Sequence, residues 1–423
     1  MGGKLLLWSL VLIFPLPLVL ALNLQSTDVP SMRLYITWGL IAYSWWLLAI
    51  LLSVRPTWLG RGVGLPSVYA LHGMLGVFAL VPAYLHKENT FAPDDLSRLL
   101  GDWGFYAALA VLCYSVVFMS GWLTDRSRLA LKVKSRLETV FRRRLSVWIH
   151  RLNLVVVLMI WLHVHLIGRV NQHFWFMTLF DLYTVVVLGT YVWKKWVAPD
   201  SFLTGAVQEN VALNDSTRQI AIALHRTATA SRPGDFYFLS FDDTGLGREW
   251  HPFSATDERH DVLTFTIRQT GDYTSKIGSV VPGTAVRLEG PFGRFDSVLK
   301  ARTDDTPLVL VGMGAGIAPL LSLTAEYLTA RRIHLLWSVR RADDAYYSRL
   351  LEQYEHRSGG LLTVTTQVGR FHRNQLSTVL AEEEVTRGEF FVVGPNPAVL
   401  ATQRMLRRIG VSRSRIHHER LTM

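Results

Sequence analysis

The sequence predicts a six-helix transmembrane bundle followed by two soluble domains, a small antiparallel β-barrel and an α/β domain with a parallel sheet. Half of the residues are hydrophobic, and nearly all the long apolar runs lie before Lys194. The rest of the chain alternates short strand-like runs with amphipathic stretches, as soluble domains do. A chain of 423 residues is also too long for one ordinary core. We therefore expect domains at residues 1–197, 198–301 and 302–423.

Each of six apolar segments is long enough to cross a hydrocarbon layer of about 30 Å. The segments are Leu5–Leu22, Leu34–Val54, Val68–Leu85, Trp103–Leu123, Val147–Gly168 and Phe174–Trp193. Basic residues crowd the connection between the fourth and fifth segments, whereas the connection between the third and fourth is richer in acidic residues. Positive charge marks the cytoplasmic side of a membrane protein. We therefore expect both termini and the soluble domains in the cytoplasm. The net charge of +11 then reports this topology, and we expect no nucleic-acid partner.

Histidines mark two of the six segments. His72 and His86 belong to the third segment, and His150, His163 and His165 belong to the fifth. In a helix, 14 residues advance about 21 Å and return to within about 40° of the starting direction. His72 and His86 therefore face one way near opposite membrane surfaces. Because the third and fifth segments run in the same direction, His150 can meet His72 at the inner level. His163 or His165 can meet His86 at the outer level.

The outer partner on the fifth segment stays open on helix geometry alone. In a straight helix, His163 misses the face of His150 by about 140°, and His165 misses it by about 60°. Imidazole is a common haem ligand, and two facing histidines can hold a b-type haem inside a helical bundle. Any one of these histidines alone is better explained as a core residue with satisfied hydrogen bonds. Two pairs at matching depths favour two haem sites.

After the last apolar segment the pattern changes to short strands. The run Leu263–Arg268 alternates apolar and polar residues, and several such runs before residue 298 indicate an antiparallel barrel. Farther on, strand-like runs alternate with helical stretches, which indicates a parallel sheet flanked by helices. These later runs are Pro307–Val311, His334–Val339, Leu361–Thr365 and Phe390–Val393.

The first strand of the predicted parallel sheet runs directly into a glycine-rich turn. The turn reads Gly312-Met313-Gly314-Ala315-Gly316-Ile317-Ala318-Pro319 and precedes an apolar helix. Such glycines let backbone amides approach a pyrophosphate at the helix N-terminus. The usual dehydrogenase fingerprint has a third glycine where this chain has Ile317. By itself, therefore, the turn does not distinguish a nucleotide loop from an ordinary connection.

Three further motifs stand in a fixed order around this turn. They are His251-Pro252-Phe253-Ser254, Gly290-Pro291-Phe292-Gly293 and Gly394-Pro395. With these motifs, nearly the whole chain resembles the NADPH oxidase and ferric reductase superfamily, and its short single-chain bacterial members in particular. The resemblance implies six haem-binding spans in a bacterial inner membrane, fused to a ferredoxin-reductase-like module. It also implies His163 as the outer ligand before His165, because His163 matches the spacing of the family.

The resemblance assigns two sets of binding residues. Residues expected to bind FAD are His251, Pro252, Phe253, Ser254, Thr274, Ser275, Lys276, Gly290, Pro291, Phe292 and Gly293. Residues expected to bind NADPH are Gly312, Gly314, Gly316, Pro319, Ser338, Arg340, Arg370, Gly394 and Pro395. The forked donors of arginine suit a 2′-phosphate. NADPH is therefore favoured over NADH.

Two departures from the family pattern carry consequences. Val393 stands where the family commonly has cysteine before Gly-Pro, which bears on how the nicotinamide is positioned. Four residues follow Glu419, and none of them is an aromatic residue that would cover the flavin. A more open flavin face admits nicotinamide more readily, so we expect activity without a separate protein activator.

The resemblance implies electron transfer across the lipid bilayer. Electrons would pass from cytoplasmic NADPH through FAD and two b-type haems to an acceptor on the opposite side. With two histidines on each iron, the acceptor would take its electron at the haem edge. We expect O2 as the acceptor, giving superoxide. The alternatives are a ferric chelate and delivery of electrons to a periplasmic protein, and both share every motif above.

Overall fold

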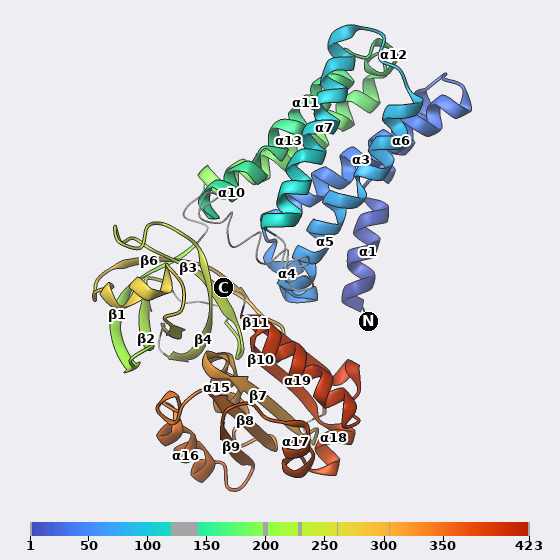
Figure 1. The fold of residues 1–423 in the computed structure, drawn as a ribbon. Coiled ribbons are helices and arrows are strands. Elements are labelled where there is room, and N and C mark those ends of the chain that lie inside the picture. Colours follow the sequence, from blue (N-terminus) through green and yellow to red (C-terminus); the bar gives the residue numbers. More distant parts are fainter. Residues whose placement is uncertain are drawn as a thin grey trace. The chain divides into compact units, whose positions relative to one another are not determined.

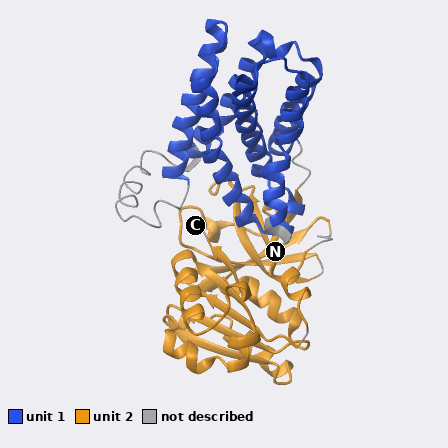
Figure 2. Cartoon of the chain, turned by 90° about the vertical axis from the view of Figure 1, so that its right-hand side faces the viewer, with its two compact units in different colours: residues 1–199 blue, residues 200–423 orange. Residues whose placement is uncertain are grey.

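The computed structural model describes residues 2–119, 143–197, 202–226, 231–259, 261–303 and 305–421. The chain divides into two compact units, residues 1–199 and 200–423 (Figure 2). The end of the fourth predicted segment and most of the predicted basic connection after it fall within residues 120–142. They therefore lie outside the described residues.

The first unit is built from helices (Figure 1). They are α1 (Gly2–Ile13), α2 (Leu16–Gln25), α3 (Pro30–Ser53), α4 (Thr57–Val63), α5 (Leu65–Phe78), α6 (Leu80–Asn89), α7 (Asp95–Phe118), α10 (Arg143–Arg151), α11 (Asn153–Leu166), α12 (Gly168–Asn171), α13 (Phe174–Val192) and a π-helical turn, Trp193–Val197. Six stretches within them are long and apolar enough to cross a membrane. They are Leu5–Gln25, Pro30–Ser53, Leu65–Asn89, Asp95–Phe118, Leu145–Leu166 and Phe174–Val197. The six predicted apolar helices are thus confirmed, and they indicate a membrane protein.

Helix α3 lies at the centre of the first unit. Its Tyr43 stacks on Phe180 of α13 with ring centroids 4.8 Å apart, and its hydroxyl lies 2.8 Å from the hydroxyl of Thr184. Helices α5 and α6 also pack against α3, and α11 packs along α7 (Figure 1). The unit therefore has two supporting helices, α3 and α7, each with a histidine-bearing span beside it.

Both histidine-bearing spans are interrupted. The third span breaks at Ala79, between α5 and α6, and Pro82 in the next turn has no N–H to donate to the carbonyl of Phe78. The fifth span breaks at Leu152, where the backbone N–H bonds the carbonyl of Ile149 in a tightened turn. The side chain of Asn153 donates to the carbonyl of His150 at 2.9 Å. The faces on either side of each break therefore no longer follow the rotation of one straight helix.

The second unit opens with a closed antiparallel barrel in the order β1-β2-β5-β4-β3-β6. Its strands are β1 (Leu203–Asn214), β2 (Thr217–Leu224), β3 (Phe236–Phe241), β4 (His251–Arg259), β5 (Val262–Arg268) and β6 (Ala285–Phe292). Inward side chains such as Tyr237, Phe265 and Leu288 are fully buried. A 3-10 helix, η3 (Thr274–Ser279), follows β5. The predicted barrel is confirmed.

A five-stranded sheet follows, in the order β11-β10-β7-β8-β9, with every neighbouring pair parallel. Its strands are β7 (Leu308–Met313), β8 (Ile333–Val339), β9 (Leu362–Val368), β10 (Glu389–Pro395) and β11 (Ile416–Leu421). Its main helices are α15 (Ala318–Tyr327), α16 (Ser348–Arg357), α17 (Arg373–Val379), α18 (Glu382–Arg387) and α19 (Asn396–Arg408), and α14 (Phe295–Lys300) precedes the sheet. Helices α15 and α16 cover one face, and α17 and α19 cover the other. The predicted parallel sheet is confirmed, with β11 as a strand that the sequence reading did not include.

Candidate functional site

The first unit brings four of the five predicted histidines together in pairs. The rings of His72 on α5 and His150 on α10 lie 5.8 Å apart between centroids, with an interplanar angle of 63°. The rings of His86 on α6 and His163 on α11 lie 6.4 Å apart, at 88°. The two pairs occupy opposite halves of the same spans, so the site has two levels, which the predicted topology makes the inner one (His72 and His150) and the outer one (His86 and His163).

All four rings are held through the same nitrogen. On α3, the carbonyls of Ala49 and Tyr35 lie 2.8 and 3.0 Å from Nδ1 of His72 and His86. On α7, the carbonyl of Ser97 lies 2.7 Å from Nδ1 of His163. Ser115, also on α7, lies 2.9 Å from Nδ1 of His150 and donates its own proton to the carbonyl of Val111. Each partner oxygen is thus an acceptor, so each Nδ1 carries the proton and each Nε2 keeps a free lone pair.

Two glycines make room for the outer pair. A Cβ atom on Gly39 of α3 would lie 2.9 Å from Cγ of His86, and a Cβ atom on Gly101 of α7 would lie 2.9 Å from Cε1 of His163. Real Cβ atoms do not approach ring atoms this closely, so any larger residue would displace the imidazole. Neither glycine was singled out by the sequence reading, because nothing in the local pattern marks the ring that it faces.

His165, the alternative outer histidine, points elsewhere. Its Nδ1 lies 3.0 Å from the carbonyl of Trp161, and its Nε2 lies 3.2 Å from a carboxylate oxygen of Asp181 on α13. Both ring nitrogens therefore have neighbours on the side of α11 away from His86. In this arrangement His163, and not His165, faces the outer partner.

In the second unit, the motif residues of the barrel form one group. The rings of His251, at the start of β4, and Tyr273, before η3, stack with centroids 3.8 Å apart. This contact places the segment His251–Ser254 beside Thr274–Lys276. The hydroxyl of Thr274 accepts hydrogen bonds from the backbone N–H groups of Thr270 and Gly271, both at 3.0 Å, which shapes the turn into η3. Lys276 donates to the carbonyl of Gly245 at 3.2 Å.

The predicted segment Gly290–Gly293 closes β6 beside β3. The Gly290–Pro291 peptide bond is cis. A Cβ atom on Gly290 would lie 2.8 Å from the ring of Tyr237, so glycine is required by the close approach of the strands. Phe292 is fully buried and packs against Phe236 and Phe238. Phe292 is therefore a core residue that shapes this edge of the barrel.

The predicted glycine turn and the Gly-Pro motif face each other at the carboxyl edge of the parallel sheet. Gly314 has a φ of +57° and follows β7, and the side-chain N–H of Trp337 donates to its carbonyl at 3.1 Å. A Cβ atom on Gly316 would overlap the carbonyl of Val393, and one on Gly394 would lie 2.7 Å from Cβ of Met313. The open backbone at the start of α15 is the type of site that binds a pyrophosphate.

The residues predicted for the 2′-phosphate lie at the ends of two neighbouring strands. Ser338 on β8 donates to the carbonyl of Gly369 at 2.7 Å, which ties the end of β8 to the end of β9. Arg340 and Arg370 follow these strands and are exposed. Two guanidinium groups are therefore available at this edge, whereas the hydroxyl of Ser338 already serves the backbone.

Arg268, at the end of β5, is a candidate residue that the sequence reading missed. Its Nε atom is buried and has no hydrogen-bond partner among the described residues. Its Nη1 lies 3.3 Å from the position that a Cβ atom on Gly314 would take. A barrel side chain thus reaches the nucleotide turn with an unused donor, as an arginine that binds phosphate would. The signal was present in the sequence, because Arg268 comes directly before the turn that leads to Thr274.

Glu419 on β11 is a second such residue. The hydroxyl of Ser254 on β4 donates to its carboxylate at 3.0 Å, so the predicted flavin segment meets the last strand of the sheet. Burial, together with the charge of Asp235, raises the pKa of Glu419 to about 7, although the bond from Ser254 opposes this shift. A carboxyl group that titrates near neutral pH therefore lies beside a flavin-site residue.

The raised pKa predicts how stability depends on pH. The folded protein binds this proton more tightly than the unfolded chain does. Glu419 therefore contributes most to the stability of the folded protein when the pH is below 4.5, the ordinary pKa of a glutamate. That stabilisation is lost as the pH rises to about 7. Glu419→Gln should therefore raise the apparent melting temperature more at about pH 8 than at about pH 5, relative to the wild type.

The matched control for this measurement is Glu352→Gln, at an exposed position on α16. Its melting temperature should keep the same offset from the wild type at both pH values. An offset for Glu419→Gln that does not change with pH would contradict the assignment.

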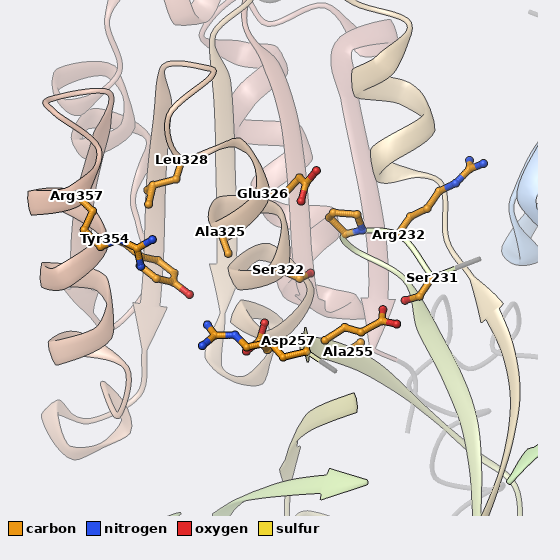
Figure 3. Close-up of a pocket in the computed structure, with 13 residues that line it drawn as sticks. Ser231, Arg232, Ala255, Asp257, Ser322, Ala325, Glu326, Leu328, Tyr354 and Arg357 are labelled. Carbon is orange, nitrogen blue, oxygen red and sulfur yellow. The ribbon is translucent and has the colours of Figure 1, made fainter. Parts of the chain in front are cut away.

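A cleft of ≈ 340 Å³ lies elsewhere in the second unit, between the far end of β4 and helices α15 and α16 (Figure 3). Asp257, Glu258 and Arg259 line it from the barrel. Ser322 and Tyr354 line it from the helices, and Figure 3 labels both of them together with Asp257. Arg259 and Asp257 form an ion pair at 2.8 Å. No predicted site residue lines this cleft, so it is separate from the candidate site.

Comparisons with known proteins find two family models that match the two domains of the second unit. Residues 206–296 match a family model described as an FAD-binding domain, and residues 310–397 match one described as an oxidoreductase NAD-binding domain. The reductase subunit of an aromatic O-demethylase from Amycolatopsis sp. is 27% identical over 233 residues, covering 52% of this chain and 69% of that protein.

Two other relatives are the ferredoxin reductase component of a Rhodococcus rhodochrous 3-ketosteroid-9-alpha-monooxygenase and ferric reduction oxidase 5 of Arabidopsis thaliana. The first is 26% identical, covering 51% of this chain and 62% of that protein. The second is 34% identical over 87 residues, covering 19% of this chain and 12% of that protein. Among solved structures, an Amycolatopsis cytochrome P450 reductase is 22% identical with a TM-score of 0.47, covering 52% of this chain and 70% of that one.

The motif-based resemblance is thus confirmed for the module that carries the motifs. The chain joins six membrane-competent helices to FAD-binding and NAD-binding domains, and it is an oxidoreductase of the ferredoxin-reductase-like type, with the module found in ferric reductases and NADPH oxidases.

Proposed function

We propose that this chain carries electrons across a membrane, from NADPH through FAD and two b-type haems to an acceptor on the opposite side. The observation that carries the proposal is the pair of facing histidines at each of two levels in the first unit. A reductase module alone serves many electron acceptors. A membrane bundle with two such pairs supports a path through the apolar layer.

The four histidines fit haem iron in their chemistry. A metal-binding histidine usually donates its other ring N–H to a carbonyl, carboxylate or water, which fixes the tautomer and the ring direction. All four Nδ1 atoms make such contacts, with Ala49, Tyr35, Ser115 and Ser97. Among the described residues, no hydrogen bond is made by their Nε2 atoms.

They also fit in their spacing. Ring centres about 6 Å apart would allow one metal ion to contact both imidazoles of a pair at ordinary metal–nitrogen distances. The measured separations are 5.8 and 6.4 Å. His72 and His150 would hold the inner haem, and His86 and His163 would hold the outer one.

The bound groups would supply the redox chemistry, because a flavin accepts two electrons at once and a haem iron passes them one at a time. The residues of the second unit would bind these groups and hold a proton beside them. The glycine turn presents backbone amides to the pyrophosphate, with Arg268 beside it. Glu419 holds a proton near neutral pH next to Ser254, one of the residues that would bind the flavin. The remaining predicted FAD and NADPH residues keep the roles that the resemblance gives them.

Arg340 and Arg370 favour NADPH as the electron donor, with NADH as the alternative. Both are exposed at the carboxyl edge of the sheet, where they can pair with a 2′-phosphate. The basic residues in the sequence of the first unit support a cytoplasmic location for the second unit, in a bacterial cell with an inner membrane. The chain acts without an obligatory protein activator.

O2 is the proposed acceptor, with superoxide as the product. Reduction of a ferric chelate is a second candidate, favoured by the similarity to ferric reduction oxidase 5. Delivery of electrons to a partner protein is a third, favoured by the similarity to reductase subunits of larger enzymes. These candidates differ in the acceptor and share the same path.

Removal of single histidines tests the two haem sites. His72→Ala or His150→Ala should leave only the outer haem, and His86→Ala or His163→Ala only the inner one, because each variant would remove one of the two histidines that hold the haem. Haem per flavin in the purified protein should fall by about half in each case. Flavin reduction by NADPH should persist, since that step precedes the haems.

The matched control is Gly73→Ala, beside His72, where an added Cβ atom would meet nothing within 4 Å. It should keep the haem content of the wild type. A full haem content in all four histidine variants would rule out these residues as the ligands.

Product assays decide the acceptor. With NADPH in air, we expect the purified chain to reduce cytochrome c in a reaction that superoxide dismutase suppresses. Activity with a ferric chelate but not with O2 would instead establish the second candidate. Slow turnover with both O2 and the ferric chelate, despite rapid reduction of the flavin, would favour delivery of electrons to a partner protein.

A further inference from the structure

Asp181 is an intramembrane carboxylate with no place in the proposed electron path. It lies on α13, about two turns into the sixth span. Ionisable side chains within membrane spans are rare and usually functional. The contacts of Asp181 connect it to the helix that carries His163.

Two side chains of α11 converge on this carboxylate. The indole N–H of Trp161 donates to its Oδ1 at 2.8 Å, and Nε2 of His165 lies 3.2 Å from the same oxygen. The rings of Trp161 and His165 also contact each other, with centroids 4.2 Å apart. Nδ1 of His165 lies 3.0 Å from the carbonyl of Trp161. The contacts among Trp161, His165 and Asp181 hold one face of the last turns of α11 against α13.

The opposite face of the same turns carries His163. Residues four apart share a helix face, whereas a residue midway between them points about 160–200° away. With Trp161 and His165 directed at Asp181, His163 is directed at Ser97 of α7 and at His86. A large rotation of this segment would exchange His163 and His165, so the contacts of Asp181 set which histidine faces the outer site.

We propose that Asp181 is a positioning residue for the outer haem site, which holds Trp161 and His165 against α13 so that His163 is the histidine presented to His86. The inference rests on the proposed function, because it concerns how one of the haem sites is assembled. The break at Leu152 frees α11 from the rotation of α10, so the direction of His163 needs a separate constraint. Asp181 supplies it from a neighbouring helix.

Two substitutions of Asp181 in the purified full chain test this role. Asp181→Leu keeps the approximate size but removes the acceptor, and Asp181→Asn keeps an oxygen for the indole N–H. In Asp181→Leu we expect about 10- to 100-fold weaker retention of the outer haem, or an altered low-spin signal from it, as for other residues that orient metal ligands. The inner haem should be unchanged. Asp181→Asn should restore the outer signal toward that of the wild type.

Haem content per flavin and electron paramagnetic resonance of the two ferric haems are the readouts. The matched control is Thr178→Val, one turn earlier on α13, because within the described part of the chain the exposed Thr178 side chain bonds only the carbonyl of Phe174 in its own helix. It should match the wild type. If Asp181→Leu loses the inner haem as well, Trp161→Phe replaces it, since that change removes only the indole donor.

The outcomes separate the inference from the proposed function. Wild-type protein without haem would overturn the proposed function. Wild-type protein with two haems, together with an unchanged outer signal in Asp181→Leu, or in Trp161→Phe where that variant replaces it, would overturn the role of Asp181 alone.

Discussion

The hydrogen bond at each histidine Nδ1 is the interaction on which the proposed electron path depends. Two helices provide these bonds, α3 for His72 and His86, and α7 for His150 and His163. Because the partner oxygens act as acceptors, all four rings keep Nε2 for a metal. The same two helices carry Gly39 and Gly101, which leave room for the outer rings. Thus α3 and α7 hold the four proposed ligands without themselves providing any.

The sequence predicted the depth of the histidines but not their final directions. Depth follows from the rise per residue, which the breaks in the helices change little. Direction depends on rotation, and the turn at Leu152 changes the rotation of α11 relative to α10. A straight helix favoured His165 over His163 by about 80°. Family spacing favoured His163, and the contacts of His163 and His165 agree with that order.

In the second unit, the short strand-like runs and their spacing predicted both the barrel and the parallel sheet. Local patterns were sufficient to predict these two folds, because each alternating strand and the glycine turn depend on residues that lie close together in the sequence. Contacts between distant segments were not predicted. Ser254 meets Glu419 across the barrel and the sheet, and Arg268 reaches Gly314 from another strand. Such pairings arise from the closure of the fold, so they add a proton-holding group and a phosphate-binding candidate to the residues identified by motif.

Electron transfer through sealed vesicles tests the central claim most directly. The purified chain would be placed in vesicles that enclose ferricyanide, which does not cross the bilayer, and NADPH would be added outside. We expect the enclosed ferricyanide to be reduced, and we expect His72→Ala to abolish this reduction while external ferricyanide is still reduced. Enclosed ferricyanide that stays oxidised with the wild-type chain, while external ferricyanide is consumed, would contradict transfer across the membrane.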